Sequence, residues 1–263
     1  MSAFELANVF SNVTNRLISE FEEHPELYEK SDIDTITSEG WLIKYCVFLE
    51  KMSEEDSVQM ITKILKWRKT KAFADKTDAD FPKEMYEIGC AFPYTQDKDG
   101  NCVLVFRLDR RISQMGKMAK KFLLHQLNKV DKQANGNNKF VVLVDYSNST
   151  MAYSDQKLVF YLFKLMRHFP ACKYFIHYNA NPITRRLIQY TYRKSIDKFA
   201  EKKQIFDHFH DQYLPQYLGG TCPKPVAEAP KESQSIVDCY QNLGMNKKVA
   251  LKRKESMKKY VPA

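Results

Sequence analysis

The sequence predicts an α/β protein: a mixed, largely parallel five-stranded sheet flanked by helices, preceded by a helical subdomain. Two apolar runs, "KFVVLVDY" and "CKYFIHYN", have the composition of strands buried on both faces of a parallel sheet. Two further β-rich runs, "YEIGCAFPY" and "CVLVFRL", are separated by Asp99 and Gly100, a dipeptide typical of hairpin turns. Helical patterns alternate with the later strands, which indicates right-handed crossovers between parallel strands.

The first third of the chain reads as helical. Apolar residues at helical spacing predict a helix over 4–30, and the helical pattern continues to about Lys51. Ser53 and the three acidic residues after it are a good helix start. The polar stretch "DKTDADFPKE" then has the character of a linker. We therefore expect a helical subdomain over 1–80.

Three amphipathic helices are expected between the strands of the sheet. The first, "MGKMAKKFLLHQLNKVDKQANG", stops at Gly136, and the second, "SDQKLVFYLFKLMRHFP", ends at Pro170. The third begins with Asn181 at its N-cap and Pro182 at its first helical position. A short strand near "SIDKFA" and a helix near "KKQIFDHF" follow, so we expect a single domain over 81–223.

The charge of the chain is unevenly distributed. The first 60 residues hold four Lys or Arg against thirteen Asp or Glu, a net charge of −9. The rest of the chain must then carry +18 to reach the formal total of +9. An acidic first part of the chain followed by a strongly basic remainder indicates anionic partners, which can be phospholipid, nucleic acid or acidic protein.

The last forty or so residues are polar and basic, and we expect a flexible tail over 224–263. Its end, "MNKKVALKRKESMKKYVPA", has a net charge of +6 between Lys247 and Lys259. Such a tail can contact an anionic leaflet or simply keep the protein in solution. The scarcity of aromatic residues among its basic ones disfavours nucleic-acid binding.

Composition also predicts where the protein works. No apolar run approaches the length of about 18 residues that a membrane span needs. The start "MSAFELANVF" lacks the features of a secretory signal. Six cysteines without a CxxC pair are typical of reduced thiols in a cytosolic protein. We expect a cytoplasmic monomer without a cofactor or a metal, which can bind membranes peripherally.

Candidate chemical sites are few. The sequence contains no nucleotide-binding loop and no nucleophile motif, so we do not expect an enzyme. In "DHFHD", His208 and His210 would lie about 200° apart on a helix, which favours solvated or half-buried histidines over a metal site. Asp145 ends an apolar strand, where open α/β sheets bind ligands, but it can equally cap the following loop.

Five segments occur in an order that matches one known family. They are "ITKILKWRK", "EIGCAFPYTQDKDGNCVLVFRL", "FVVLVDYSNS", "RHFPACKYFIHYNANP" and "LPQYLGGT", and they extend over roughly 35–225. Together they resemble the CRAL-TRIO lipid-binding domain, with spacing closest to that of motile-sperm-domain-containing proteins. In this resemblance "LPQYLGGT" closes the fold: Leu214 and Leu218 anchor it, while Gly219 and Gly220 allow a conformation that bulkier residues resist.

The resemblance implies an apolar pocket between the sheet and a movable lid helix, holding one lipid such as a phosphatidylinositol. It places Thr150 and Tyr153 at the mouth of the pocket and Ile183, Leu187 and Ile188 on the lid face. We further expect the basic residues of the lid segment to hold anionic headgroups or membrane phosphate: Arg185, Arg186, Arg193 and Lys194. For all of these residues, ordinary packing or surface polarity is the alternative.

Two functions therefore stay open. The first is a lipid-binding or lipid-transfer protein that docks on anionic membranes. The second is a membrane-tethering or protein-interaction module that keeps the fold without a lipid cavity. The lid segment, 181–199, is shorter than the family usually shows, which favours the second function.

Overall fold

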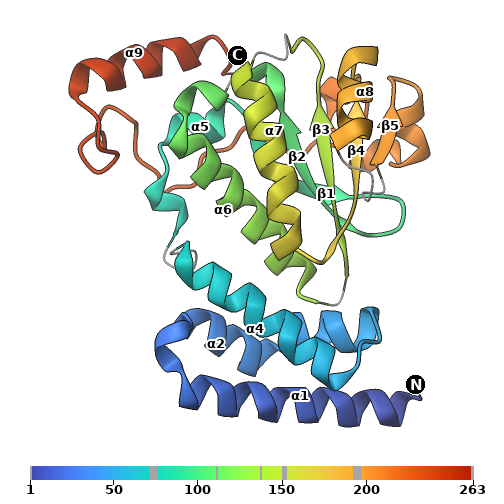
Figure 1. Ribbon diagram of the computed structural model, residues 1–263. Helices are drawn as coiled ribbons and strands as arrows, with labels where there is room; N and C mark the ends of the chain where they lie inside the picture. Colours follow the sequence, from blue (N-terminus) through green and yellow to red (C-terminus); the bar gives the residue numbers. More distant parts are fainter. Residues whose placement is uncertain are drawn as a thin grey trace.

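The computed structural model describes residues 2–71, 76–110, 112–136, 138–149, 153–191 and 197–261. A five-stranded sheet lies at its centre, helices α6 and α7 run alongside it, and helices α1 to α4 form a bundle at one end (Figure 1). The longer helices are α1 (Ala3–Glu23), α2 (Lys30–Glu39), α4 (Glu54–Thr70), α6 (Lys117–Ala134), α7 (Tyr153–Leu165), α8 (Pro182–Thr191) and α9 (Lys247–Lys258). The shorter ones are α3 (Trp41–Lys44) and α5 (Lys83–Glu87).

The sheet has its strands in sequence order. They are β1 (Ala91–Gln96), β2 (Cys102–Arg107), β3 (Phe140–Asp145), β4 (Cys172–Tyr178) and β5 (Asp197–Ala200). Strand β1 pairs antiparallel with β2, and the remaining pairs are parallel, which confirms the predicted mixed, largely parallel five-stranded sheet. All six residues of the central strand β3 are buried, as expected for a strand covered on both faces.

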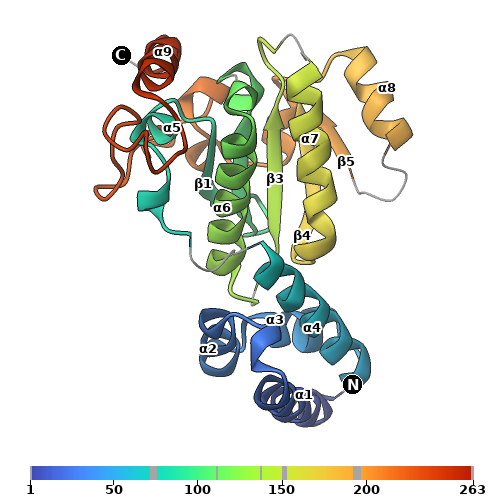
Figure 2. The ribbon, with the colours of Figure 1, turned by 60° about the vertical axis from the view of Figure 1, so that its left-hand side comes forward.

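The two faces of the sheet are covered by different parts of the chain. Alternating side chains such as Phe106 and Val142 pack with α6 and α7 on one face, which Figure 2 shows from the helical side. The other set, including Val105 and Leu143, packs against the segment that follows β5. The period-2 alternation of a strand separates these two sets of side chains.

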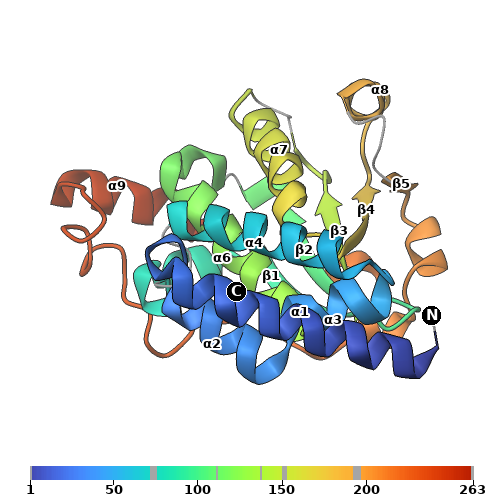
Figure 3. The same ribbon diagram turned by 60° about the horizontal axis from the view of Figure 1, so that its bottom comes forward.

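The N-terminal bundle differs from the nearly continuous helix that the sequence predicted. Helix α1 ends before Pro25, and α2 ends at Gly40, which has a left-handed φ of 65°. The chain therefore doubles back twice, and α1 packs against α4 (Figure 3). Buried residues of the bundle and of the sheet belong to one continuous core. The division at residue 80 stays a prediction.

One buried ion pair links two helices of the N-terminal bundle, and a further hydrogen bond links it to α6. Arg68 of α4 donates from Nε and Nη2 to the Asp32 carboxylate of α2 at 2.7 and 2.8 Å. Both Nη atoms also lie 3.2 Å from Oδ1 of Asn128 in α6. The guanidinium lies 4.8 Å from the centre of the Trp41 ring, so its planar face is packed as well. A fully buried charge is tolerated here because each of its edges has an acceptor.

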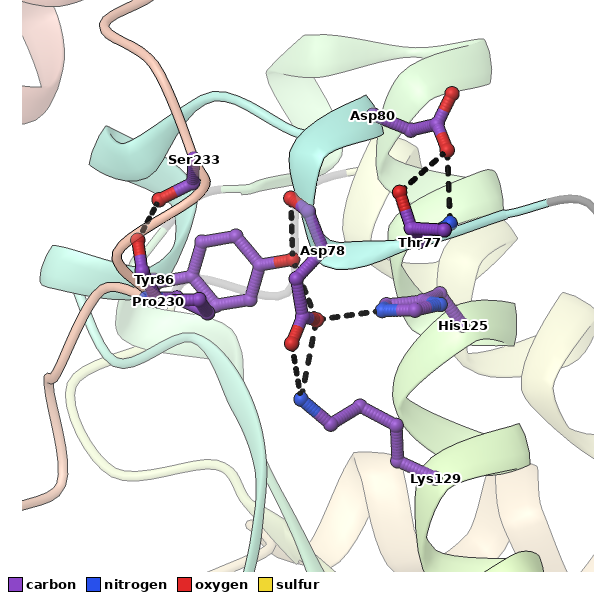
Figure 4. A network of polar contacts seen from close by, with 8 residues as sticks. All are labelled: Thr77, Asp78, Asp80, Tyr86, His125, Lys129, Pro230 and Ser233. Atoms are coloured by element: carbon purple, nitrogen blue, oxygen red, sulfur yellow. Dashed lines mark hydrogen bonds and ion pairs between the residues drawn. The ribbon is translucent and has the colours of Figure 1, made fainter.

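A second polar network ties the linker to α6 (Figure 4). Asp78 accepts hydrogen bonds from His125 Nε2 at 2.7 Å, from Tyr86 Oη at 3.0 Å and from Lys129 Nζ at 2.8 Å. Burial opposes ionisation of Asp78, but the hydrogen bonds from Lys129 and His125 outweigh it and lower the pKa of the carboxyl group. The part of the linker around Asp78, a loop in the sequence interpretation, is thus fixed by charge-assisted hydrogen bonds.

The closing segment "LPQYLGGT" has the structure expected of it. Leu214 and Leu218 are buried in the core on the sheet face opposite α6. A Cβ added to Gly220 would lie 2.1 Å from the carbonyl oxygen of Leu214, and Gly219 has a φ of 91°. Glycine is therefore required at Gly220 by lack of space and favoured at Gly219 by its backbone conformation.

The C-terminal segment differs from the flexible tail that its composition suggested. Ile236, Ala250 and Met257 are buried, and α9 lies beside α5. The buried Glu84 carboxylate of α5 accepts hydrogen bonds from Ser235 Oγ and from the backbone N–H of Ile236, the latter at 2.8 Å. A buried acceptor far away in sequence thus anchors a segment that has few apolar residues of its own.

Candidate functional site

Helix α8 follows directly on β4 and stands at the carboxyl end of the parallel strands, next to β5 (Figure 2). Its start is built as the sequence predicted: Oδ1 of Asn181 accepts the backbone N–H of Thr184 at 2.8 Å, and Pro182 is the first helical residue. Before it, Asn179 adopts a left-handed φ of 53° and donates from Nδ2 to Ser147 Oγ at 2.8 Å. The turn into α8 is therefore fixed by side chains.

One face of α8 packs on the protein. Thr184 and Ile188, four residues apart, are both buried. Arg185 donates from Nε to the carbonyl oxygen of Ala180 at 2.8 Å and from Nη2 to Glu201 at 2.9 Å. This arginine holds the helix against the chain that follows β5.

A second face of α8, about 115° around the helix from the buried one, is apolar and exposed. Ile183 and Tyr190 are each 80% exposed, and the half-buried Leu187 lies between them at positions i, i+4 and i+7. The exposed Arg186 lies beside this stripe. Large apolar side chains aligned on an exposed helix face, next to a cation, are typical of a surface that contacts another body.

The structure brings some of the expected site residues together and separates others. Ile188 faces inward, whereas Ile183 faces outward, because residues five apart on a helix point about 140° apart. The three apolar residues expected on one lid face therefore do not share a face. Arg185 is held by intramolecular partners, while Arg186 is open to solvent.

The other expected site residues are not placed. Thr150, Arg193 and Lys194 lie outside the described residues, and Tyr153 is described only as the first residue of α7. Their proposed roles stay predictions.

A buried polar relay lies below α8 and was not predicted from the sequence. His177 of β4 is fully buried, with Nδ1 3.0 Å from Tyr146 Oη and Nε2 3.1 Å from Asp197 Oδ1. Because a carboxylate can only accept, Nε2 carries the proton, and in the neutral ring Nδ1 accepts from Tyr146. Burial raises the pKa of Tyr146, which keeps its phenol protonated. The relay joins the residue that follows β3, the next-to-last residue of β4 and the first residue of β5.

Asp145 caps the loop that follows β3, which is one of its two predicted roles. Its Oδ1 accepts the backbone N–H of Ser147 at 2.8 Å, which caps the loop after β3. Its Oδ2 lies 4.0 Å from Nε of Arg107 at the end of β2. Burial raises the pKa of the Asp145 carboxyl group, and the hydrogen bonds from Ser147 limit that rise.

A compact charged cluster lies at the same edge, at the end of β2. Asp109 lies between Arg107, at 3.3 Å from its Nη2, and Arg110, at 3.4 Å from its Nε. The Arg107 guanidinium lies 4.0 Å from the centre of the Tyr217 ring, which belongs to the closing segment. Burial and the neighbouring Arg107 lower the pKa of Arg110. This cluster links the closing segment to the sheet.

Cavities lined by described residues include the following three. One of about 510 Å³ lies between the β1–β2 turn, 96–100, and residues 210–213, and its lining side chains are mostly charged or polar. One of about 260 Å³ lies between 79–80 and 232–243, and one of about 170 Å³ lies between β1, α6 and 224–230. Ligand pockets of drug-sized molecules are usually about 300–1,000 Å³ and mostly apolar. None of these three has both properties.

Two further properties concern only the described part of the chain. No three His, Cys, Asp or Glu side chains within it are grouped as metal ligands would be. No helix within it has the length and apolar character that crossing a bilayer requires.

The chain was also compared with models of known protein families. No family model matches it.

Proposed function

We propose that this protein is a lipid-binding protein of the CRAL-TRIO type that docks on anionic membranes through α8. The observation that carries the proposal is the exposed stripe of α8, in which Ile183 and Tyr190 are each 80% exposed beside Arg186. An apolar stripe with a neighbouring cation fits a membrane interface, where side chains enter the acyl boundary and arginine meets phosphate. The mixed sheet and the closing "LPQYLGGT" segment support the fold part of the proposal.

The ligand part of the proposal is tested by native mass spectrometry of the purified protein, followed by lipid extraction and analysis. We expect a single adduct of lipid mass at close to one per chain, or its appearance after incubation with phospholipid vesicles. A protein that stays free of lipid in both experiments contradicts lipid binding.

The docking part is tested with Ile183→Asn and Tyr190→Asn combined in one chain. Each fully buried side chain of this size contributes about 1.5–3 kcal/mol, so even partial insertion of both predicts at least a tenfold weaker binding to anionic vesicles, about 1.4 kcal/mol. The matched control is Phe4→Asn, which removes a 76% exposed apolar side chain from α1 in the acidic bundle. Equal losses for the α8 variant and the control contradict docking through α8.

A second function is favoured by a specific observation. The exposed apolar stripe of α8, in which Ile183 and Tyr190 are each 80% exposed, also suits a module that tethers membranes or binds proteins without carrying a lipid. The two experiments separate the functions, because a tether binds vesicles through α8 and carries no lipid adduct.

A further inference from the structure

We infer that α9 is a second membrane-contacting surface, which acts with α8 to fix the protein in one orientation on an anionic bilayer. This inference rests on the proposed docking at α8. It concerns a helix that the sequence places in a basic tail and that the structure places on the folded body.

Helix α9 is held rigidly by its inner face. Ala250 and Met257 are buried, and Lys254 donates from Nζ to Ser235 Oγ at 2.8 Å while lying 3.6 Å from Glu84 Oε1. Beyond the helix, Nη1 of Arg110 donates to the carbonyl oxygen of Tyr260 at 2.8 Å. The backbone of α9, from which the outer side chains project, is therefore attached to the folded body.

The outer face of α9 combines cations with exposed apolar side chains. The exposed lysines are Lys247, Lys248, Lys252, Lys258 and Lys259. Leu251 is 50% exposed, and Val249 and Val261 are exposed to a lesser degree. From Lys247 to Lys259 the net charge is +6, with Glu255 as the single acid. Lysines interleaved with aliphatic side chains suit the headgroup region of an anionic leaflet. A surface that binds nucleic-acid bases would favour aromatic side chains instead.

The position of α9 relative to α8 and to the acidic N-terminal bundle supports a contact with an anionic surface. Both α9 and α8 lie at the end of the molecule opposite the N-terminal bundle, in two views related by rotation about the vertical axis (Figures 1 and 2). In Figure 3, which is turned about the horizontal axis, the two helices lie apart, α8 near β4 and β5 and α9 towards the opposite edge of the molecule. The opposite end carries the −9 of the first 60 residues. An anionic surface therefore attracts one end and repels the other, and two separated contacts define the orientation.

The test replaces Lys247, Lys248 and Lys252 with Glu in the full chain and measures partition onto phosphatidylcholine vesicles with and without phosphatidylserine. Lys258 is left unchanged, because its Nζ lies 2.7 Å from Glu255. Glutamates in the first turn of a helix interact favourably with its dipole, so the substitutions at 247 and 248 do not weaken α9 itself.

The matched control is Lys30→Glu, Lys51→Glu and Lys63→Glu, which changes the net charge equally on exposed lysines of the N-terminal bundle. One basic residue near an anionic leaflet strengthens binding about fivefold, so the α9 variant should bind phosphatidylserine vesicles at least tenfold more weakly. We expect less than a twofold change for the control. Raising the salt from about 0.1 M to about 1 M, which shortens the screening length from about 10 Å to about 3 Å, should remove the difference.

Several outcomes overturn the inference. Equal losses in both triple variants mean that only net charge matters, and no loss in the α9 variant means that α9 makes no contact. Tighter binding of the wild type to a duplex or single-stranded oligonucleotide than to vesicles, lost in the α9 variant, assigns the surface to nucleic acid instead. The proposed function is judged separately by the lipid adduct: a protein without lipid whose vesicle binding still depends on α9 keeps the inference and loses the carrier function.

Discussion

The Asp131 carboxyl group should make the stability of this protein depend on pH near neutrality. Asp131 lies in α6, is almost fully buried, and its Oδ1 has no hydrogen-bond partner among the described residues. Burial raises its pKa from 3.8 to about 7, and the positive charge of Arg68 limits the rise. The substitution Asp131→Asn keeps the shape of the side chain and removes the ionisation.

The size and sign of the effect on the free energy of unfolding follow from the difference between the pKa of Asp131 in the folded chain and in the unfolded chain. A rise of about three units corresponds to about 4 kcal/mol, at about 1.36 kcal/mol per unit. Below about pH 4 the group is protonated in both the folded and the unfolded chain, and the favourable contribution of the protonated form is fully present. As the pH rises to about 7, Asp131 ionises in the unfolded chain before it ionises in the folded chain, so the free energy of unfolding of the wild type falls. Above that pH no further loss of stability from Asp131 is expected. Asp131→Asn should therefore exceed the wild type in free energy of unfolding by up to about 4 kcal/mol above pH 7, and by little near pH 4.

The assay is urea unfolding, followed by circular dichroism, at pH values from about 4 to about 8. The control is Asp34→Asn, which removes an exposed carboxylate from α2 and should leave the pH dependence unchanged. A difference between Asp131→Asn and wild type that stays constant across this range would refute the reasoning, because it would show that Asp131 does not change its ionisation there.

Three further substitutions test other parts of the structure. Asp32→Asn leaves the Arg68 charge buried without its carboxylate and should cost about 3–5 kcal/mol in urea unfolding; a loss below about 1 kcal/mol would mean that water replaces the partner. Tyr146→Phe removes the hydrogen bond to His177 Nδ1 and should cost about 1–3 kcal/mol, with a shifted ¹⁵N resonance of that nitrogen; an unchanged resonance argues against the contact. Gly220→Ala introduces a Cβ at 2.1 Å from a backbone oxygen and should lower stability by about 1–3 kcal/mol, and an unchanged thermal midpoint would show that the closing segment can move aside.

The strands could be predicted because each carries its own signal. Strand β3 is apolar along its whole length since both of its faces are covered, and the hairpin before it contains Asp99 and Gly100 at its turn. The start of α8 was equally readable, because Asn181 and Pro182 act within a few residues of each other. Local chemistry was sufficient for these elements.

The orientation of α8 and the fold of the C-terminal segment could not be predicted in the same way. Which of Ile183 and Ile188 points inward depends on where β5 lies, and the helical pattern alone does not contain that information. The segment around Ser235 is held by Glu84, a residue about 150 positions earlier. The His177 relay likewise joins residues from β4, from β5 and from the loop after β3, none of which has a distinctive neighbourhood in the sequence.

The ion pair between Arg68 and Asp32 also limits how the molecule can move. Because Asn128 of α6 accepts from the same guanidinium, α2, α4 and the body of the protein share one buried charge. A swing of the N-terminal bundle about the linker would leave that charge without its acceptors in a dry interior. The N-terminal bundle therefore does not swing independently of α6, and amide exchange in α4 should keep pace with exchange in α6.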